Sequence, residues 1–140
     1  MSSQSDNMLF LMELSVLQSK LDKRLSLALS IHGVSLSEFM VLHQLANAPD
    51  HCLSRVVLAS AVHLTASGVT RLLNPLEKLH IVEKQKNSRD ARVSLVHLTE
   101  VGLETYVNAK QTYSETADAL LDKVDTNELS EMLNSMRVAI

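Results

Sequence analysis

The feature that most constrains the fold is a pair of short helical segments separated by only two residues. Ser54 is a suitable N-cap for the first segment and Thr65 for the second, because their hydroxyls can accept hydrogen bonds from free backbone amides. The apolar residues predicted to face a shared interior are Val57, Leu58, Ala61, Val62, Val69, Leu72, Leu73, Leu76 and Leu79. Two helices joined by so brief a turn indicate a helix-turn-helix over about residues 54–79.

A period of two residues replaces the helical period after residue 80. Residues 81–85 predict a strand and residues 86–91 a polar turn. The following segment alternates, with Val93 and Leu95 on one face and Val96 and Leu98 on the other. The sequence therefore predicts a β-hairpin wing, which completes a winged helix-turn-helix core over about residues 36–98.

Two residues near the end of the second helix affect its predicted path. Pro75 has no amide to bond to the Arg71 carbonyl, so it should bend or loosen the helix there. His80 stands at the helix end, where a left-handed backbone is expected, and histidine tolerates that conformation. The first turn of the helix lies before Pro75 and should be unaffected.

Longer helical segments flank this core on both sides. Residues 6–32 form one, which Gly33 ends, and Ser35 with Glu38 has the spacing of a capping box for the next helix. Two more helices over residues 99–139 are predicted to begin at the caps Thr99 and Asp125. Since apolar residues cover more than one side of the first helix, it requires more than one partner surface, which indicates a second chain.

Composition supports a mainly α fold with one small hairpin. A chain of 140 residues favours a single domain, spanning residues 1–140, and its three Gly and two Pro favour helices joined by short connections. Hydrophobic residues make up 46% of the chain but aromatic residues only 3%, so Leu, Val, Ala and Met must fill the interior. The scarcity of aromatic residues argues against a ligand clamped between aromatic rings.

Charge is distributed unevenly along the chain. The whole chain carries a net charge of −3, yet six basic and three acidic residues between Thr65 and His97 give that segment +3. The remainder therefore carries −6. A basic segment on an acidic body fits a nucleic-acid surface more closely than the net charge suggests, although chance clustering is an equal alternative on charge alone.

Several classes of site and location are not expected. A single cysteine excludes an internal disulfide, and the six histidines lack metal-ligand spacing, so neither a metal nor a cofactor is predicted. No nucleophile–base spacing or phosphate-binding glycine loop indicates an enzyme. No basic stretch precedes the first apolar run, and no run reaches the ~20 residues of a membrane span, so we expect a cytoplasmic protein without a membrane partner.

The order of predicted elements and four local motifs resemble the MarR family of bacterial regulators. The motifs are LTASGVTRL at residues 64–72, LEKL at 76–79, SRDAR at 88–92 and LTEVG at 98–102. The resemblance implies a homodimeric regulator that binds double-stranded DNA, which we expect to be a ligand- or stress-responsive repressor. Its two-fold symmetry predicts a pseudo-palindromic operator.

The first turn of the second helix is expected to enter the major groove, where small polar residues can reach base edges. Gly68 would allow close approach to DNA, or it tolerates a frayed first turn; Arg71 would contact a guanine edge or a phosphate. Ser54 would contact a phosphate, cap its helix, or do both. The predicted DNA-binding residues of the helix-turn-helix are Ser54, Thr65, Ala66, Ser67, Gly68, Thr70 and Arg71.

In the wing, Arg89 at the tip is the candidate for insertion into the minor groove, and Lys86 and Ser88 would reach phosphates. The resemblance implies that Asp90 and Arg92 form an ion pair that shapes the wing, and that Arg92 also touches DNA. Asp90 is equally suited to bonding its own turn backbone, and both roles make it structural.

Two further predictions concern the flanking helices. The predicted dimer interface consists of Leu9, Phe10, Met12, Leu14, Leu129, Leu133 and Met136. Many members of the resembled family hold a small effector between the dimerisation helices and the DNA-binding core. Here His32, Met40 and His43 could line such a pocket.

Two alternative functions stay open from the sequence. A winged helix can mediate protein–protein contacts without specific DNA binding, and the acidic net charge is compatible with that role. Cys52 could act as a redox sensor, with His51 and Arg55 nearby to lower its pKa, or it could be a small apolar residue with no reactive role.

Overall fold

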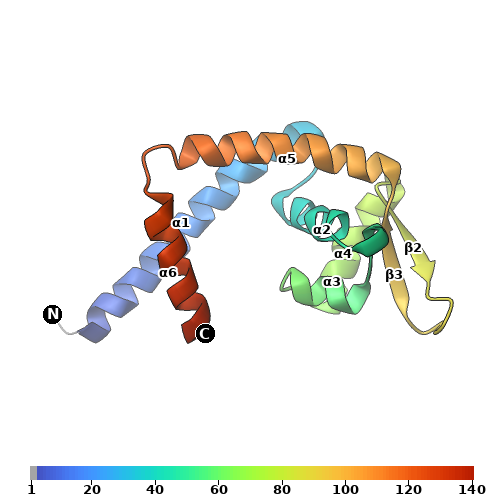
Figure 1. Ribbon diagram of the computed structural model, residues 1–140, viewed down its shortest axis with the longest axis horizontal. Coiled ribbons are helices and arrows are strands. Elements are labelled where there is room, and N and C mark those ends of the chain that lie inside the picture. Colours follow the sequence, from blue (N-terminus) through green and yellow to red (C-terminus); the bar gives the residue numbers. More distant parts are fainter. Residues whose placement is uncertain (1–2) are drawn as a thin grey trace.

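The computed structural model describes residues 3–140, and side chains from residue 6 onward. Two parts are joined by one long helix, which runs along the top of the molecule in Figure 1. The elements are α1 (Ser3–Leu29), η1 (Ser30–His32), α2 (Leu36–Ala46), η2 (Pro49–His51), β1 (Cys52–Ser54), α3 (Arg55–Ala61), α4 (Ala66–Lys78), β2 (Val82–Lys86), β3 (Ser94–Leu98), α5 (Glu100–Leu120) and α6 (Thr126–Ala139).

The predicted helix caps are confirmed. Ser35 accepts from the Glu38 amide while the Glu38 carboxylate accepts from the Ser35 amide, which is the reciprocal capping box. The other predicted caps also accept hydrogen bonds from backbone amides through their side chains; they are Ser54, Thr65, Thr99 and Asp125. Gly33 ends the first helical segment with φ of 72°, a left-handed conformation that glycine adopts without a steric penalty.

The wing is part of a three-stranded antiparallel sheet in the order β1-β3-β2. The hairpin of β2 and β3 confirms the predicted wing, although β3 begins at Ser94 rather than residue 92. Strand β1, which pairs Leu53 with Val96, was not expected from the sequence. The three residues of β1 are too few to show a period of two in the sequence. They adopt a strand conformation because they pair with β3.

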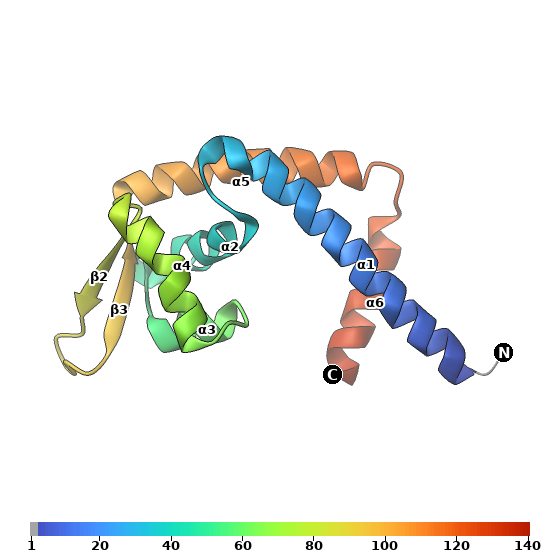
Figure 2. The ribbon, with the colours of Figure 1, turned by 180° about the vertical axis from the view of Figure 1, so that it is seen from behind.

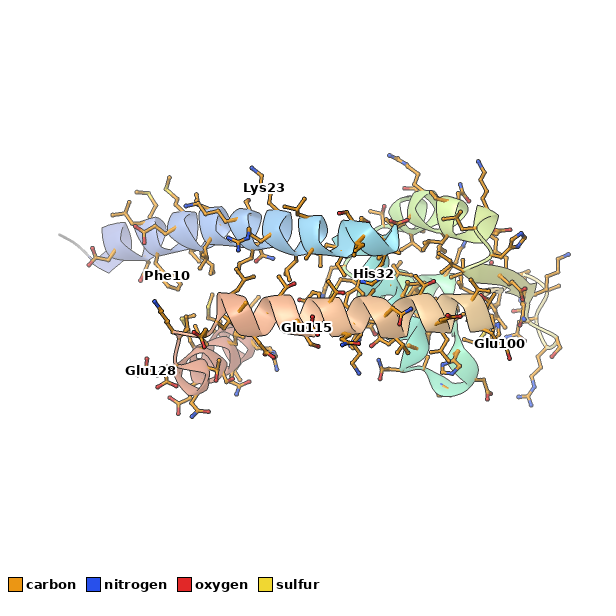
Figure 3. The ribbon with its side chains drawn as sticks, turned by 90° about the horizontal axis from the view of Figure 1, so that it is seen from above. Phe10, Lys23, His32, Glu100, Glu115 and Glu128 are labelled. Carbon is orange, nitrogen blue, oxygen red and sulfur yellow. The ribbon has the colours of Figure 1, made fainter. Side chains whose placement is uncertain are left out.

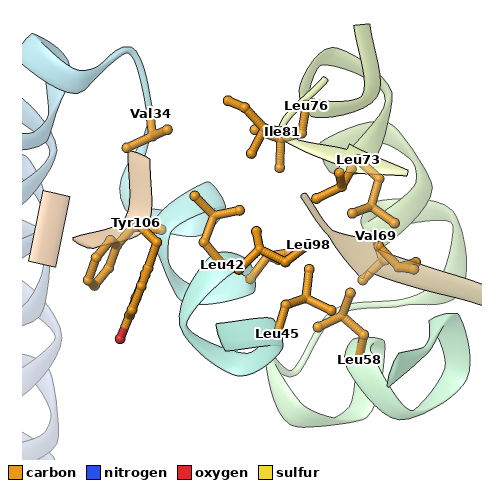
Figure 4. Packing of buried hydrophobic residues seen from close by; sticks show 14 of the residues in the cluster. Val34, Leu42, Leu45, Leu58, Val69, Leu73, Leu76, Ile81, Leu98 and Tyr106 are labelled. Carbon is orange, nitrogen blue, oxygen red and sulfur yellow. The ribbon is translucent and has the colours of Figure 1, made fainter. Parts of the chain in front are cut away.

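The core lies between the helix-turn-helix and the sheet (Figure 4). Its fully buried side chains include Leu42, Leu45, Leu58, Val69, Leu73, Leu76, Val96 and Leu98. Three predicted core residues were wrong: Val57 and Leu79 are 52% and 58% exposed, and Ala61 is also exposed. Since α3 has only seven residues, one narrow face packs against its neighbours, so the predicted apolar stripe was too wide.

Pro75 does not interrupt helix α4, while the predicted bend there stays a prediction. Helix α4 continues through Pro75 to Lys78, and its end is closed by a bond of 3.2 Å from the Leu79 amide to the Pro75 carbonyl. Both Arg71 and Pro75 are exposed, so the carbonyl that loses its helical partner can bond to water instead. His80 has the predicted left-handed backbone, with φ of 60°.

Helices α1 and α5 run antiparallel and in contact (Figures 2 and 3). The end of α5 leads into α6, which lies away from the winged helix. The side of α1 near its start is apolar and exposed, with Leu9, Phe10 and Met12 between 42% and 59% exposed. Among residues 3–140 no single helix is long and apolar enough to cross a membrane; only two bent helix pairs reach that length and composition together.

Candidate nucleic-acid interface

The first turn of α4 presents a small, polar surface. Thr65 Oγ1 accepts from the Gly68 amide at 3.0 Å, and Ser67 Oγ lies 3.2 Å from Thr65 Oγ1. Thr65, Ala66 and Ser67 are all exposed. Because these side chains are short, the edge of a DNA base could reach the backbone and hydroxyl groups of the turn.

A Cβ at Gly68 would make one tight contact within the protein, with the hydroxyl of the Thr65 cap. A Cβ at Gly68 would meet only Thr65 Oγ1 at 3.1 Å and Leu64 Cβ at 3.7 Å, and the backbone there is not left-handed. A glycine inside a helix costs about 1 kcal/mol relative to alanine. Close approach to DNA and a first turn that tolerates glycine both stay predictions for this position.

Two cations lie near the second turn of α4, and they differ in their surroundings. Arg71 is exposed and is free to reach a ligand. Arg55, which was not among the contacts predicted from the sequence, donates from Nη1 to Thr70 Oγ1 at 2.9 Å. Thr70 Oγ1 in turn donates to the Ala66 carbonyl at 3.0 Å, so Arg55 connects α3 to the predicted reading helix.

The wing tip is shaped by short hydrogen bonds between its own side chains and backbone. Asn87 Oδ1 accepts from the Arg89 amide at 2.8 Å, and Asp90 accepts from both the backbone and the side chain of Arg92. The implied ion pair is present, with Arg92 Nε 3.2 Å from Asp90 Oδ1. Its side-chain and backbone hydrogen bonds lower the pKa of Asp90 below the ordinary value of 3.8.

Arg89 is exposed at the tip of the wing, between the exposed Ser88 and the ion pair. Lys86, at the end of β2, is exposed as well. Lys84, further back on β2, has a different surrounding: its ammonium lies 3.1 Å from Glu77 Oε2 and 3.4 Å from Asn74 Oδ1 on α4. Lys84 therefore anchors the wing to the helix, whereas Arg89 is available to a ligand.

Comparison with known proteins identifies this arrangement. A sequence profile of the MarR family matches residues 32–93. The HTH-type transcriptional regulator PrsX from Escherichia coli is 29% identical over 133 residues, covering 92% of this chain and 80% of PrsX. The chain is therefore similar to MarR-family regulators, in agreement with the predicted resemblance.

Solved structures of MarR-family proteins share this fold over nearly the whole chain. Sco3205 from Streptomyces coelicolor, a MarR family regulator in complex with DNA, has a TM-score of 0.88 at 20% identity, covering 96% of this chain and 86% of that one. A single-residue variant of MarR from Escherichia coli, complexed with operator DNA, has a TM-score of 0.86 at 20% identity, with 100% and 99% coverage. The predicted winged-helix fold is thus confirmed, and so is the resemblance to MarR-family transcriptional regulators.

Three of the four aromatic side chains of this chain gather between α2 and α5, although aromatic residues are scarce in the sequence. Phe39 stacks on Tyr106 and Tyr113 with ring centroids 5.6 and 5.0 Å apart. His43 Nδ1 lies 2.7 Å from the Tyr106 hydroxyl, and the chain brings these residues together only through the packing of α5 on α2.

A cavity of about 300 Å³ opens beside this cluster, lined by Phe39, Met40, His43, Lys110, Tyr113 and Ser114. It contains two of the three residues predicted for an effector pocket. His32 does not line it; its Nε2 lies 2.6 Å from Thr112 Oγ1, which joins the end of η1 to α5 (Figure 3). His32 therefore lies outside this cavity, and the effector site stays a prediction.

The surroundings of Cys52 oppose the redox alternative. Burial first, and then the negative charge of Asp50, raise the pKa of the Cys52 thiol above its ordinary value of 9.0. A reactive cysteine needs the opposite shift, because the thiolate is the nucleophile. Neither His51 nor Arg55 lowers the pKa as the sequence had suggested; His51 Nδ1 instead lies 3.0 Å from the Ala46 carbonyl, and Arg55 is directed at Thr70.

Proposed function

We propose that this protein is a MarR-type repressor that binds a pseudo-palindromic operator as a homodimer and is released by a small molecule. The observation that carries the DNA-binding part is the common placement of the exposed α4 turn and the exposed Arg89 wing tip on one winged helix. A helix entering the major groove and a wing reaching the adjacent minor groove need both features together.

Within that proposal, the first turn of α4 reads base edges through Thr65, Ser67 and the Gly68 backbone. Arg71 adds a base or phosphate contact one turn further on. Lys86, Ser88 and Arg89 hold the wing on the backbone and in the minor groove, where the negative potential is strongest. The solved complexes of Sco3205 and of the MarR variant with DNA support this assignment by their shared fold.

The test is selection of bound duplexes from a random pool, followed by binding measured as a function of salt. We expect a recovered consensus with two inverted half-sites, and a steep fall of log K with log salt. Arg89→Ala should flatten that slope by about 0.9 for each phosphate that the Arg89 charge neutralises. If the wild-type protein shows no measurable affinity at low salt, this chain acts through protein contacts instead and the proposal fails.

The dimer is supported by apolar surface that one chain leaves uncovered. Leu9, Phe10 and Met12 on α1 and Leu133 on α6 are each more than 40% exposed, and α6 lies beside the same end of the molecule (Figure 1). A groove between α1 and α6 is lined by Leu14, Gln18, Met132, Leu133, Met136, Arg137 and Ile140. A second copy would bury this surface in the usual manner of obligate dimers.

Sedimentation tests the dimer with a matched pair of substitutions. Leu133→Glu places a charge on α6 inside the proposed interface, whereas Ile31→Glu places the same charge on η1, where the side chain is 82% exposed. We expect Leu133→Glu to dissociate the dimer at micromolar concentration and Ile31→Glu to leave it intact. A wild-type monomer at the same concentration contradicts the proposed assembly.

For the effector, the proposed site is the cavity beside Met40 and His43. Lys110 supplies a positive charge at its rim and Phe39 and Tyr113 supply ring faces, so a planar carboxylate such as benzoate is a suitable probe. We expect benzoate to raise the melting temperature of the wild-type protein, and Lys110→Met to remove that shift. An equal shift in the Lys110→Met variant would place benzoate elsewhere.

A further inference from the structure

A further concavity lies where the helix-turn-helix meets the wing. The predicted DNA contacts include single residues of its lining, but not the concavity as a binding site. Its volume is about 270 Å³, and it is lined by Ser54, Arg55, Val56, Arg92, Val93 and Ser94. The residues come from two distant segments, which the pairing of Ser54 with Leu95 across β1 and β3 holds side by side. The lining residues include two arginines and no carboxylate.

The two guanidinium groups at this concavity have donors left over. Arg55 uses Nη1 on Thr70, and its Nε is buried without any partner among the described residues. Arg92 uses Nε and Nη2 on Asp90, which leaves Nη1 for a ligand, and its side chain is 91% exposed. A guanidinium group carries five N–H donors in a planar fork that suits the oxygens of a phosphate.

The position of the concavity relates it to one strand of the duplex. In the proposed complex α4 lies in the major groove and the wing tip in the adjacent minor groove, and a single sugar–phosphate strand separates these two grooves. The junction between α3 and the sheet therefore faces that strand. Figure 1 shows β3 on the helical side of the hairpin and β2 on its outer side, so residues of the β3 end lie next to α3.

We propose that Arg55, with Arg92, forms a phosphate-binding site that holds a phosphodiester of the DNA strand between the two grooves. The hydroxyls of Ser54 and Ser94 complete the lining with small polar groups. Because Arg55 also donates to Thr70, a phosphate held here fixes the position of the α4 turn that reads the bases. This inference rests on the proposed DNA-binding function.

The experiment measures the salt dependence of binding to the selected duplex for four proteins. Arg55→Met removes the charge but keeps an unbranched apolar side chain, and Arg55→Lys keeps a positive charge that can still bind phosphate. Lys123→Met removes an equal charge in the exposed α5–α6 turn, far from the wing. We expect Arg55→Met to flatten the slope of log K against log salt by about 0.9 per protomer, with Arg55→Lys and Lys123→Met close to wild type.

The weakening in Arg55→Met should be equal for selected and scrambled duplexes, because a phosphate contact carries no base information. If wild-type binding is salt-dependent and Arg89→Ala flattens it, while Arg55→Met leaves the slope unchanged, the phosphate site is overturned and the proposed function stands. If the wild-type protein does not bind DNA, both fall.

A free phosphate ion could bind the same guanidinium groups as a DNA phosphodiester. Thermal melting distinguishes these two ligands. At constant ionic strength, inorganic phosphate should leave the melting temperatures of wild type and Arg55→Met equally unchanged up to millimolar concentration. A phosphate-dependent rise in wild type that is absent from Arg55→Met, together with an unchanged DNA salt slope, would assign the concavity to the free ion and overturn the proposal.

Discussion

Two glycines occupy the same local position in two helices, and the structure predicts different outcomes for the same substitution. Gly68 and Gly102 each follow a threonine cap by three residues, and each donates its amide to the threonine hydroxyl at 3.0 Å. Gly68 faces open space apart from its own cap and Leu64. At Gly102, a Cβ would lie 2.1 Å from the Ile81 carbonyl oxygen and 2.7 Å from Leu98 Cδ1.

The cost of Gly102→Ala follows from that close approach. Helix α5 must move by about 1 Å to restore an ordinary separation, and overpacking of this kind costs about 1–3 kcal/mol. The same Ile81 carbonyl accepts from both the amide and the hydroxyl of Thr99, at 3.1 and 3.0 Å. Weakening these two bonds adds about 1–3 kcal/mol, and the helix propensity of alanine returns about 1 kcal/mol, so the net loss is about 1–5 kcal/mol.

Urea unfolding followed by circular dichroism, at equal protein concentration, measures both variants. We expect Gly102→Ala to lower the free energy of unfolding by ~3 kcal/mol, the middle of that range. Gly68→Ala should stay within about 1 kcal/mol of wild type, since alanine gains helix propensity and meets only Thr65 and Leu64. Free energies of unfolding within roughly 0.5 kcal/mol of each other for the two variants would refute the packing argument.

Three further predictions concern single side chains. Tyr106→Phe removes the hydroxyl 2.7 Å from His43 Nδ1 but keeps the ring stack, so unfolding free energy should fall by about 1 kcal/mol, measured in urea. Because the pKa of Asp90 is lowered, the ionised carboxylate and its bonds to Arg92 should persist below pH 3.8 and disappear only as the pH falls through the lowered pKa. An NMR titration of the Asp90 carboxyl group measures this midpoint. Arg92→Ala should return the midpoint toward 3.8. The raised pKa of Cys52 keeps the thiol protonated until the pH exceeds 9.0, so alkylation by iodoacetamide should be slow at about pH 7. For the same reason, peroxide should affect DNA binding no more in wild type than in Cys52→Ser.

Local signals in the sequence determined the helices, their caps and the hairpin. Serine, threonine and aspartate at the helix starts, Gly33 at a helix end and the change of period after residue 80 act within a few residues, and the structure agrees with each. The motifs at residues 64–72 and 88–92 also indicated the family and the exposed turn and wing tip.

Only the tertiary structure decided which apolar residues are buried and which distant side chains meet. Val57 and Leu79 have the spacing of core residues but face solvent, because no described element covers that side of their helices. The strand β1, the Phe39–Tyr106–Tyr113 cluster and the contact of Arg55 with Thr70 each join segments whose approach depends on packing elsewhere. Periodicity describes one element at a time, whereas burial, aromatic stacking and the pairing of charges depend on which surfaces the fold places in contact.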